Sequence, residues 1–327
     1  MRETVHEVTV QVPGKVNLTL EILGKRPDGY HELRSILMPV SVYETVQVRT
    51  RADGEVTLRT IGEGVDCSEL ERLPMEKQLA YRAVVAMRRA CNRPDAGCDI
   101  RIVKRIPIGA GMGGGSADAA GVLCALRALW NPALPEADYL AAGASIGSDI
   151  PALQLGGAVR MEGRGERVSR LLPPGTPSPK PFWLVVVHPG FPISTRSVYE
   201  AVDAEDFCLT QKAGICENCA RSVCSGDVRA AAQSLFNGLQ RTVSRLYPNT
   251  EYFETALGRG GAIVTLLSGS GSAVFGLAEN EETAKQIQRS LPPNVWSNVV
   301  QTLPDGVMAA HGPLTPIVMV RIHVGQP

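Results

Sequence analysis

The stretch Pro107-Ile-Gly-Ala-Gly-Met-Gly-Gly-Gly-Ser-Ala-Asp-Ala-Ala120 decides the fold of this chain. It follows an alternating apolar run, Asp99-Ile-Arg-Ile-Val-Lys104, and leads into a long apolar segment that ends near Trp130. This pattern predicts a strand, a glycine loop and a helix. Glycine costs backbone entropy, so five glycines within seven positions indicate positive φ angles and a close approach of backbone N–H groups to a ligand. With a helix N-terminus directly behind it, the loop is typical of a phosphate-binding site.

Known phosphate-binding loops differ in the residues that accompany their glycines. A P-loop ends in Gly-Lys-Ser/Thr, whereas this loop ends in Gly115-Ser-Ala117. Gly109-x-Gly111-x-x-Gly114 matches the dinucleotide pattern, but the acidic residues at the required distance, Glu136 and Asp138, fall at a helix start. The chain lacks the His-Arg-Asp and Asp-Phe-Gly motifs of protein kinases. A glycine-rich turn without a ligand is the simpler alternative, and the flanking strand and helix disfavour it.

Length and charge restrict the class of protein. The chain has 327 residues, which suggests about two domains. Lys plus Arg and Asp plus Glu are both 33, so the net charge indicates neither a nucleic-acid nor a membrane partner. The polar N-terminus does not resemble a signal peptide, and no apolar run approaches the roughly 20 residues of a membrane span. We expect a cytoplasmic protein that is a monomer or a weak homodimer.

The eight cysteines include one Cys-x-x-Cys pair, Cys216 and Cys219, within the group Cys208 to Cys224. A structural zinc site requires a second such pair or a histidine pair, and a redox pair requires a βαβ start. The sequence shows neither feature, so reduced thiols are the favoured interpretation and a metal or redox role is the alternative.

Alternation and helical spacing divide the chain into two halves. Strands are expected at 5–12, 15–23, 36–43, 45–51, 56–61 and within 156–168, with helices at 75–91 and 136–144. Five prolines between Pro173 and Pro181 mark a linker, so we place the domain boundary between residues 172 and 173. Beyond it we expect strands at 182–187, 262–267, 273–277 and 295–302, a helix start at 194–199 and a helix at 281–291. This order indicates an α+β arrangement.

Two further residues carry chemistry. Lys15, in Pro13-Gly-Lys-Val-Asn17-Leu, lies at a strand start, where its ammonium can bind a phosphate or stabilise a developing alkoxide. Asp149, in Gly147-Ser-Asp-Ile-Pro151, precedes an apolar segment that could raise the pKa of a general base. The simpler alternatives are a solvated lysine and an ordinary Asx turn.

Five motifs in this order give the chain a resemblance to the GHMP kinases, which phosphorylate small molecules such as galactose, homoserine and mevalonate. They are Pro-x-Lys-x-Asn-Leu, Asp28-Gly-Tyr-His31, the glycine loop, Gly-x-Asp149-x-Pro and Ser268-Gly-Ser-Gly-Ser272, and they span Pro13 to about Leu277. The resemblance implies a two-domain α+β fold with an N-terminal ATP-binding domain (1–172) of the ribosomal protein S5 domain 2-like type. It also implies a C-terminal ferredoxin-like sandwich (173–327), with the active site in the cleft between the domains.

The Asp28-Gly-Tyr-His31 element indicates the branch of the family whose acceptor carries a cytidine diphosphate group. The resemblance implies that the chain phosphorylates the C2 hydroxyl of such a polyol with ATP as donor and Mg²⁺ as cofactor, in the non-mevalonate route to isoprenoid precursors. Lys15 and Asp149 would flank the hydroxyl, with Asp149 as general base. ATP would contact Pro107, Gly109, Gly111, Gly113, Gly114, Gly115, Ser116, Ala117 and Gln78, with Ser116 as a candidate ligand of Mg²⁺. The acceptor would contact Asn17, Tyr30, His31, Tyr199, Gly269, Ser270 and Gly271, with the two tyrosines stacking on the cytosine and His31 hydrogen-bonding its edge.

Four positions depart from the family pattern. Ala117 replaces a usual serine, Gln78 replaces a usual asparagine, and Phe236-Asn-Gly-Leu-Gln240 loses two carboxylates of the family's Phe-Asn-Asp-Leu-Glu. The alternatives are a GHMP kinase with another small alcohol as acceptor, a nucleotide-binding protein without catalysis, and an oxidoreductase that binds NAD through its glycine loop.

Overall fold

The computed structural model describes residues 5–202, 214–305 and 319–324. The first sheet has eight strands, five of which lie in the order β12-β1-β2-β4-β3. Of the other three, β5 pairs with β2, β6 pairs with β5, and β8 pairs with β1. Its strands are β1 (Val5–Lys25), β2 (His31–Arg51), β3 (Val56–Gly62), β4 (Gly97–Lys104), β5 (Val159–Gly163), β6 (Arg167–Arg170), β8 (Phe236–Asn237) and β12 (Met319–Val324). The helices of the first half are α1 (Ser68–Arg72), the 3-10 helix η1 (Met75–Lys77), α2 (Leu79–Ala90), α3 (Gly114–Trp130), α4 (Glu136–Ala144) and α5 (Ile150–Leu155).

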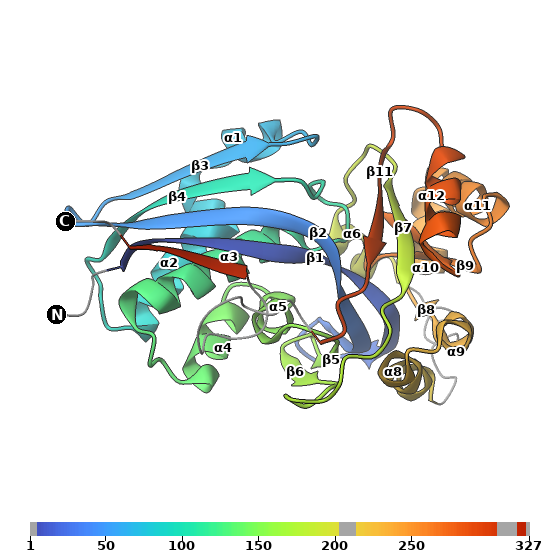
Figure 1. The fold of residues 1–327 in the computed structure, drawn as a ribbon, viewed down its shortest axis with the longest axis horizontal. Coiled ribbons are helices and arrows are strands. Elements are labelled where there is room, and N and C mark those ends of the chain that lie inside the picture. Colours follow the sequence, from blue (N-terminus) through green and yellow to red (C-terminus); the bar gives the residue numbers. More distant parts are fainter. Residues whose placement is uncertain (1–4, 203–213, 306–318, 325–327) are drawn as a thin grey trace.

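Helices α2 and α3 cover one face of this sheet (Figure 1). Val8, Val10 and Val12 of β1 alternate toward α3, whose own residues are buried almost all round. The apolar character of this helix therefore has a packing cause, as the sequence predicts.

The second sheet has the strand order β11-β7-β10-β9, with every neighbouring pair antiparallel. Its strands are β7 (Trp183–His188), β9 (Val264–Leu267), β10 (Val274–Ala278) and β11 (Trp296–Gln301). Its helices are α6 (Thr195–Glu200), α8 (Ile215–Ser225), α9 (Val228–Ser234), α10 (Gln240–Leu246), α11 (Asn249–Arg259) and α12 (Glu281–Arg289). In chain order the four strands lie 4-1-3-2 across the sheet, which is the split βαβ arrangement of a ferredoxin-like domain. The predicted fold class is confirmed.

The two sheets pack against each other. Leu184, Val186 and Phe275 of the second sheet share one apolar cluster with Val16 and Met38 of the first. In Figure 1 the curved ends of β1 and β2 run beneath β7 and β11. The expected boundary at 172/173 stays a prediction, and β8 and β12 from beyond it join β1 in the first sheet.

Two strand pairs expected from the sequence are single long strands. β1 continues through Pro13-Gly14 with a shift of register, because a bulge lets the ladder to β2 continue. β2 continues through Glu44, a fully buried carboxylate that pairs with a lysine of β4. A buried ion pair leaves no mark in hydrophobic alternation, so the sequence suggested an interruption.

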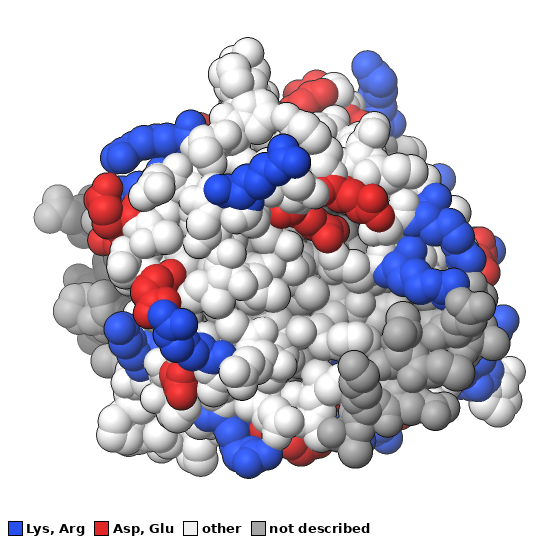
Figure 2. Space-filling model, turned by 90° about the vertical axis from the view of Figure 1, so that its right-hand side faces the viewer, with Lys and Arg blue, Asp and Glu red and all other residues white. Residues whose placement is uncertain are grey.

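The outer surface has no gathered charge of one sign on the face shown in Figure 2, where basic and acidic side chains are interspersed around a largely uncharged centre. Among the described residues, no helix combines the length and the apolar character that crossing a membrane requires.

Candidate active site

Lys15 and Asp149 lie together, although they are far apart in the sequence. The backbone N–H of Lys15 donates to the carbonyl of Met112 (2.9 Å), which ties β1 to the glycine loop. Its Nζ donates to Asn17 Oδ1 (2.6 Å) and lies 3.4 Å from Asp149 Oδ2. Lys15 is only 4% exposed, whereas the Asp149 side chain is 31% exposed. A small molecule can therefore reach the carboxylate, with the ammonium fixed beside it.

The conformation of Asp149 disfavours the simple turn interpretation. It occupies the N-cap position of α5, yet its side chain makes no capping hydrogen bond to that helix. The carboxylate instead faces Lys15. An N-cap aspartate normally accepts a bond from the helix N–H groups, so this carboxylate is kept for another partner.

A residue that the sequence analysis missed fixes Asn17. The Asn17 Nδ2 donates to Ser35 Oγ (2.8 Å), and Ser35 Oγ donates to the carbonyl of Thr19 (2.5 Å). The amide orientation is set by this chain, which leaves Asn17 Oδ1 facing Lys15. A serine at the start of the apolar run of β2 was the available signal.

The predicted glycine loop has the backbone that its composition requires. Gly109, Gly111 and Gly113 have φ angles of +66°, +71° and +71°, and α3 begins at Gly114. A Cβ on Gly111 would lie 2.1 Å from the carbonyl oxygen of Ser268. Only glycine fits there, because the loop packs directly on the second glycine loop, 268–271.

The second glycine loop reaches the Lys15 pair. A Cβ on Gly269 would lie 3.1 Å from Asn17 Oδ1 and 3.2 Å from Lys15 Nζ. Asn237 Nδ2 donates to the carbonyls of Leu267 and Gly269, both at 2.8 Å. Asn237 and Gln240, whose Oε1 accepts the Leu267 N–H (3.0 Å), thus position this loop. The segment Phe236–Gln240 therefore supports the site from behind, and an amide at Gln240 suffices for that bond.

A buried ion cluster lies behind the first glycine loop. Lys104 Nζ donates to Glu44 Oε1 (2.9 Å) and to Asp118 Oδ2 (2.7 Å), and the three side chains are at most 8% exposed. Glu44 also accepts the backbone N–H of Arg105 (2.7 Å). Burial raises the pKa of Glu44 to about 7 against the opposing effect of Lys104, and burial also raises the pKa of Asp118. Sequence reasoning missed this cluster, since its members lie on β2, β4 and α3.

The opposite end of the site is aromatic. The His31 ring lies 5.4 Å from the Tyr199 ring at an interplanar angle of 33°, and His31 is 8% exposed. Burial, with a smaller effect of the Lys25 charge, lowers the pKa of His31, so the imidazole is neutral near pH 7. Tyr30 is 57% exposed, so its ring is available to a flat ligand.

One cavity of about 1060 Å³ connects these parts. The predicted site residues on its wall are Lys15, Asn17, Tyr30, His31, Pro107, Gly109, Gly111, Gly113, Gly114, Gly115, Ser116, Asp149, Tyr199, Gly269 and Ser270. Gln78, Ala117 and Gly271 are not part of the wall. Ala117 is fully buried in α3, and the Gln78 amide donates to the carbonyls of Leu70 and Leu73 (both 3.1 Å), which fixes the connection between α1 and α2.

The Cys-x-x-Cys pair lies in α8 and is not part of the cavity wall. Cys216 and Cys219 are fully buried among apolar side chains, and burial raises the pKa of their thiols to about 11 and about 12. Both are therefore protonated at neutral pH. In the described part of the chain, no group of three or more His, Cys, Asp or Glu side chains is arranged to hold a metal, and Cys208 lies outside that part.

Known proteins resemble this chain over most of its length. The model of the GHMP kinases N terminal domain matches residues 78–157, and that of the GHMP kinases C terminal domain matches residues 219–298. The 4-diphosphocytidyl-2-C-methyl-D-erythritol kinase of Pelotomaculum thermopropionicum is 37% identical over 86% of this chain and 92% of its own length. That of Symbiobacterium thermophilum is 35% identical over 90% of this chain and 99% of its own length.

Solved structures extend the likeness to three dimensions. A crystal structure of 4-(cytidine 5'-diphospho)-2C-methyl-D-erythritol kinase superimposes with a TM-score of 0.73 and 32% identity, covering 90% of this chain and 99% of that one. A homoserine kinase from Cytophaga hutchinsonii shares the fold at a TM-score of 0.71 and 18% identity, covering 93% of this chain and 96% of its own. The chain therefore belongs to the 4-diphosphocytidyl-2-C-methyl-D-erythritol kinase family within the GHMP kinases.

Proposed function

We propose that this chain transfers the γ-phosphoryl group of ATP to the C2 hydroxyl of 4-diphosphocytidyl-2-C-methyl-D-erythritol, a step in isoprenoid precursor synthesis. The observation that carries the proposal is the position of the Lys15–Asp149 pair. It lies on the wall of one cavity that has glycine loops on one side and a neutral histidine with two tyrosines on the other. The first side suits a triphosphate and the second suits a nucleobase.

Asp149 accepts the proton that the hydroxyl loses as its oxygen attacks the γ-phosphorus. Lys15 stabilises the negative charge on that oxygen, and Asn17 keeps the ammonium in place. Phosphoryl transfer has a loose transition state, so most of the rate enhancement comes from alignment and electrostatics rather than from covalent chemistry. ADP and the phosphorylated alcohol are the products.

The triphosphate is held by the backbone N–H groups from Gly111 to Ser116, where the dipole of α3 adds positive potential. The cavity wall here also offers the oxygens of Ser116 and Asp118, and Asp118 Oδ1 is buried without a hydrogen-bond partner in the described part of the chain. Such oxygen donors fit Mg²⁺, which takes one or two protein ligands together with phosphates and water. When bound, Mg²⁺ neutralises the charge of the transferring phosphates.

The cytosine of the acceptor lies between Tyr30 and Tyr199 and is hydrogen-bonded along its edge by His31. A buried neutral imidazole carries one donor and one acceptor, which suits the mixed edge of cytosine. Stacking of a base on tyrosine contributes on the order of 1–3 kcal/mol. We further expect a cytoplasmic monomer or weak homodimer.

The test is ADP release with Mg²⁺ and ATP in the presence of 4-diphosphocytidyl-2-C-methyl-D-erythritol, mevalonate, homoserine or galactose. Turnover confined to the first acceptor supports the proposal. Turnover with another alcohol would preserve the roles of Lys15 and Asp149 and remove the assignment of the acceptor. Replacing Tyr199 by alanine should raise KM for the cytidylyl acceptor and leave KM for ATP unchanged.

A further inference from the structure

The turn between β5 and β6 presents an arginine at the mouth of the cavity. The Glu166 carboxylate accepts the backbone N–H of Arg164 (2.6 Å), and Gly163 and Gly165 have φ angles of +76° and +106°. A Cβ on Gly163 would lie 2.7 Å from Glu166 Oε1, so the carboxylate is held against the turn. Arg164 is exposed and lies on the cavity wall. The turn is thus built to project this one side chain.

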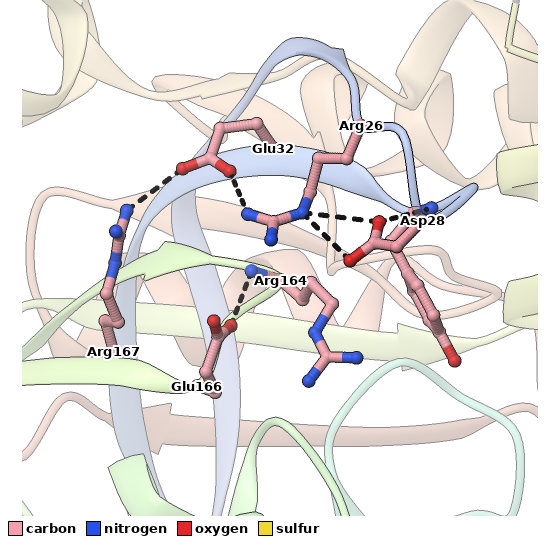
Figure 3. A network of polar contacts seen from close by, with 7 residues as sticks. Arg26, Asp28, Glu32, Arg164, Glu166 and Arg167 are labelled. Carbon is pink, nitrogen blue, oxygen red and sulfur yellow. Dashed lines mark hydrogen bonds and ion pairs between the residues drawn. The ribbon is translucent and has the colours of Figure 1, made fainter.

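The Arg164 guanidinium lies over the ring of Tyr30, with 4.9 Å from its carbon to the ring centroid. Its neighbours Arg26 and Arg167 are both engaged by Glu32, at 2.5 Å and 2.9 Å. Figure 3 shows Arg164 apart from that ion-paired chain, with a dashed line only from its backbone nitrogen to Glu166. In the described part of the molecule, Arg164 forms no ion pair within 4.0 Å of a carboxylate, although its charge acts on the nearby Asp28, which pairs with Arg26.

Most other cations of the cavity wall are already paired with carboxylates. Lys15 faces Asp149, Lys104 faces Glu44 and Asp118, and Arg196 pairs with Glu200 at 2.7 Å. Of the wall cations, Lys25 and Arg164 are those that form no ion pair within 4.0 Å among the described residues, and Lys25 lies opposite His31 in the β1–β2 ladder. Two cations without a close ion pair therefore lie at the aromatic end of the cavity, where the carboxylate acting on Arg164 is Asp28, itself paired with Arg26.

We propose that Arg164 is a specificity residue that binds the diphosphate of the acceptor while its guanidinium keeps the Tyr30 ring in place. The inference rests on the proposed function, because it assumes a nucleoside diphosphate group beside Tyr30. A diphosphate joined to a base through one ribose lies next to the stacking ring. A planar guanidinium can stack on the tyrosine and direct its N–H edge to phosphate oxygens at the same time.

The experiment compares the full-length wild type with Arg164→Gln and Arg164→Lys. A matched control is Arg167→Gln, in β6 of the same hairpin, whose side chain pairs with Glu32 outside the cavity wall. We expect Arg164→Gln to raise KM for the acceptor by about 10- to 100-fold, the range of a charge-assisted hydrogen bond. The kcat and KM for ATP should stay near wild-type values, Arg164→Lys should recover part of the loss, and Arg167→Gln should resemble the wild type.

Direct binding of CDP and of cytidine, by calorimetry, separates the diphosphate contact from stacking alone. The wild type should bind CDP more tightly than cytidine, and Arg164→Gln should lose that preference while its cytidine affinity falls little. An equal loss for both ligands, or no loss for either, would overturn the proposal. If the wild type fails to phosphorylate the acceptor, the proposed reaction falls, whereas the ratio of CDP to cytidine affinity still decides the role of Arg164.

Discussion

Two lysines on the cavity wall, Lys15 and Lys104, face carboxylates, and the two places differ in access. Lys104 donates to Glu44 and Asp118 at 2.9 Å and 2.7 Å, and the three side chains are at most 8% exposed, although Lys104 and Asp118 reach the cavity wall. Lys15 stands 3.4 Å from a single carboxylate, Asp149, that is 31% exposed on a cavity wall. The same residue types therefore make one nearly buried cluster and one open pair. Chemistry requires the open arrangement, because a reacting hydroxyl must be able to enter between the two groups.

The largest effect should come from the open pair. Asp149→Asn should lower kcat by about 10²- to 10⁴-fold, the range for removal of a general base. ATP affinity should be nearly unchanged, and the free energy of unfolding should move by less than about 0.5 kcal/mol because the side chain is partly exposed. ADP release, ATP titration and chemical denaturation measure the three quantities. The exposed Asp138 of α4 supplies the control Asp138→Asn, and wild-type kcat in Asp149→Asn would remove the base assignment.

The nearly buried cluster around Lys104 should affect the stability of the fold more than the Lys15–Asp149 pair does. Lys104→Met leaves two buried carboxylates without their cation and should destabilise the fold by about 3–5 kcal/mol. Chemical denaturation measures this, with Lys25→Met as the control because Lys25 is exposed and outside the cluster. A stability loss as small as that of the control would mean that the cluster is not a structural one.

The free energy of unfolding measured over a range of pH tests the buried Glu44 carboxylate. Burial raises the pKa of Glu44 from 4.5 to about 7, so the folded state holds this proton more tightly than the unfolded state. The resulting stabilisation is complete below about pH 4.5 and is lost as the pH rises through about 7. The free energy of unfolding should fall by about 2–3 kcal/mol between pH 5 and pH 8. Glu44→Gln should flatten this slope, and an equal slope in both proteins would contradict it.

The smallest effect tests how the open pair is supported. Ser35→Ala removes the acceptor of Asn17 Nδ2, so Asn17 can turn its oxygen away from Lys15. A neutral hydrogen bond contributes about 0.5–1.5 kcal/mol, which corresponds to a decrease of about 2- to 12-fold in kcat. Steady-state ADP release measures it, and Ser41→Ala, elsewhere on β2, is the control. A change in KM for ATP instead would place Ser35 in the nucleotide site.

Elements encoded within one stretch of sequence were predicted, whereas contacts between residues far apart in the sequence were not. The strand, glycine loop and helix around Gly113 are encoded within one stretch, and the structure has them at the expected residues. The resemblance to the GHMP kinases led to Lys15, Asp149 and His31, which share one cavity wall. Glu44, Lys104 and Asp118 meet only after folding, and no periodicity reports a buried ion cluster.

The region from Ile215 to Arg259 was the least predictable. It forms four helices and the short strand β8, with little hydrophobic alternation to indicate them. Asp227, which accepts the N–H groups of Arg229 and Ala230, was the clearest helix start available in the sequence. The function of Asn237 was likewise hidden, because its two acceptor carbonyls lie 30 and 32 residues further along the chain.

The 21-residue strands β1 and β2 have a mechanical consequence. Each strand contributes to the core under α2 and α3 at one end and to the core shared with the second sheet at the other. β1 also pairs with β8. Rotating one half against the other would break ladder hydrogen bonds and open an apolar core. The long ladder and the shared core therefore resist a hinge motion between the two halves. A stiff pair of strands keeps Lys15, in the middle of β1, in a fixed position between the two ends of the cavity.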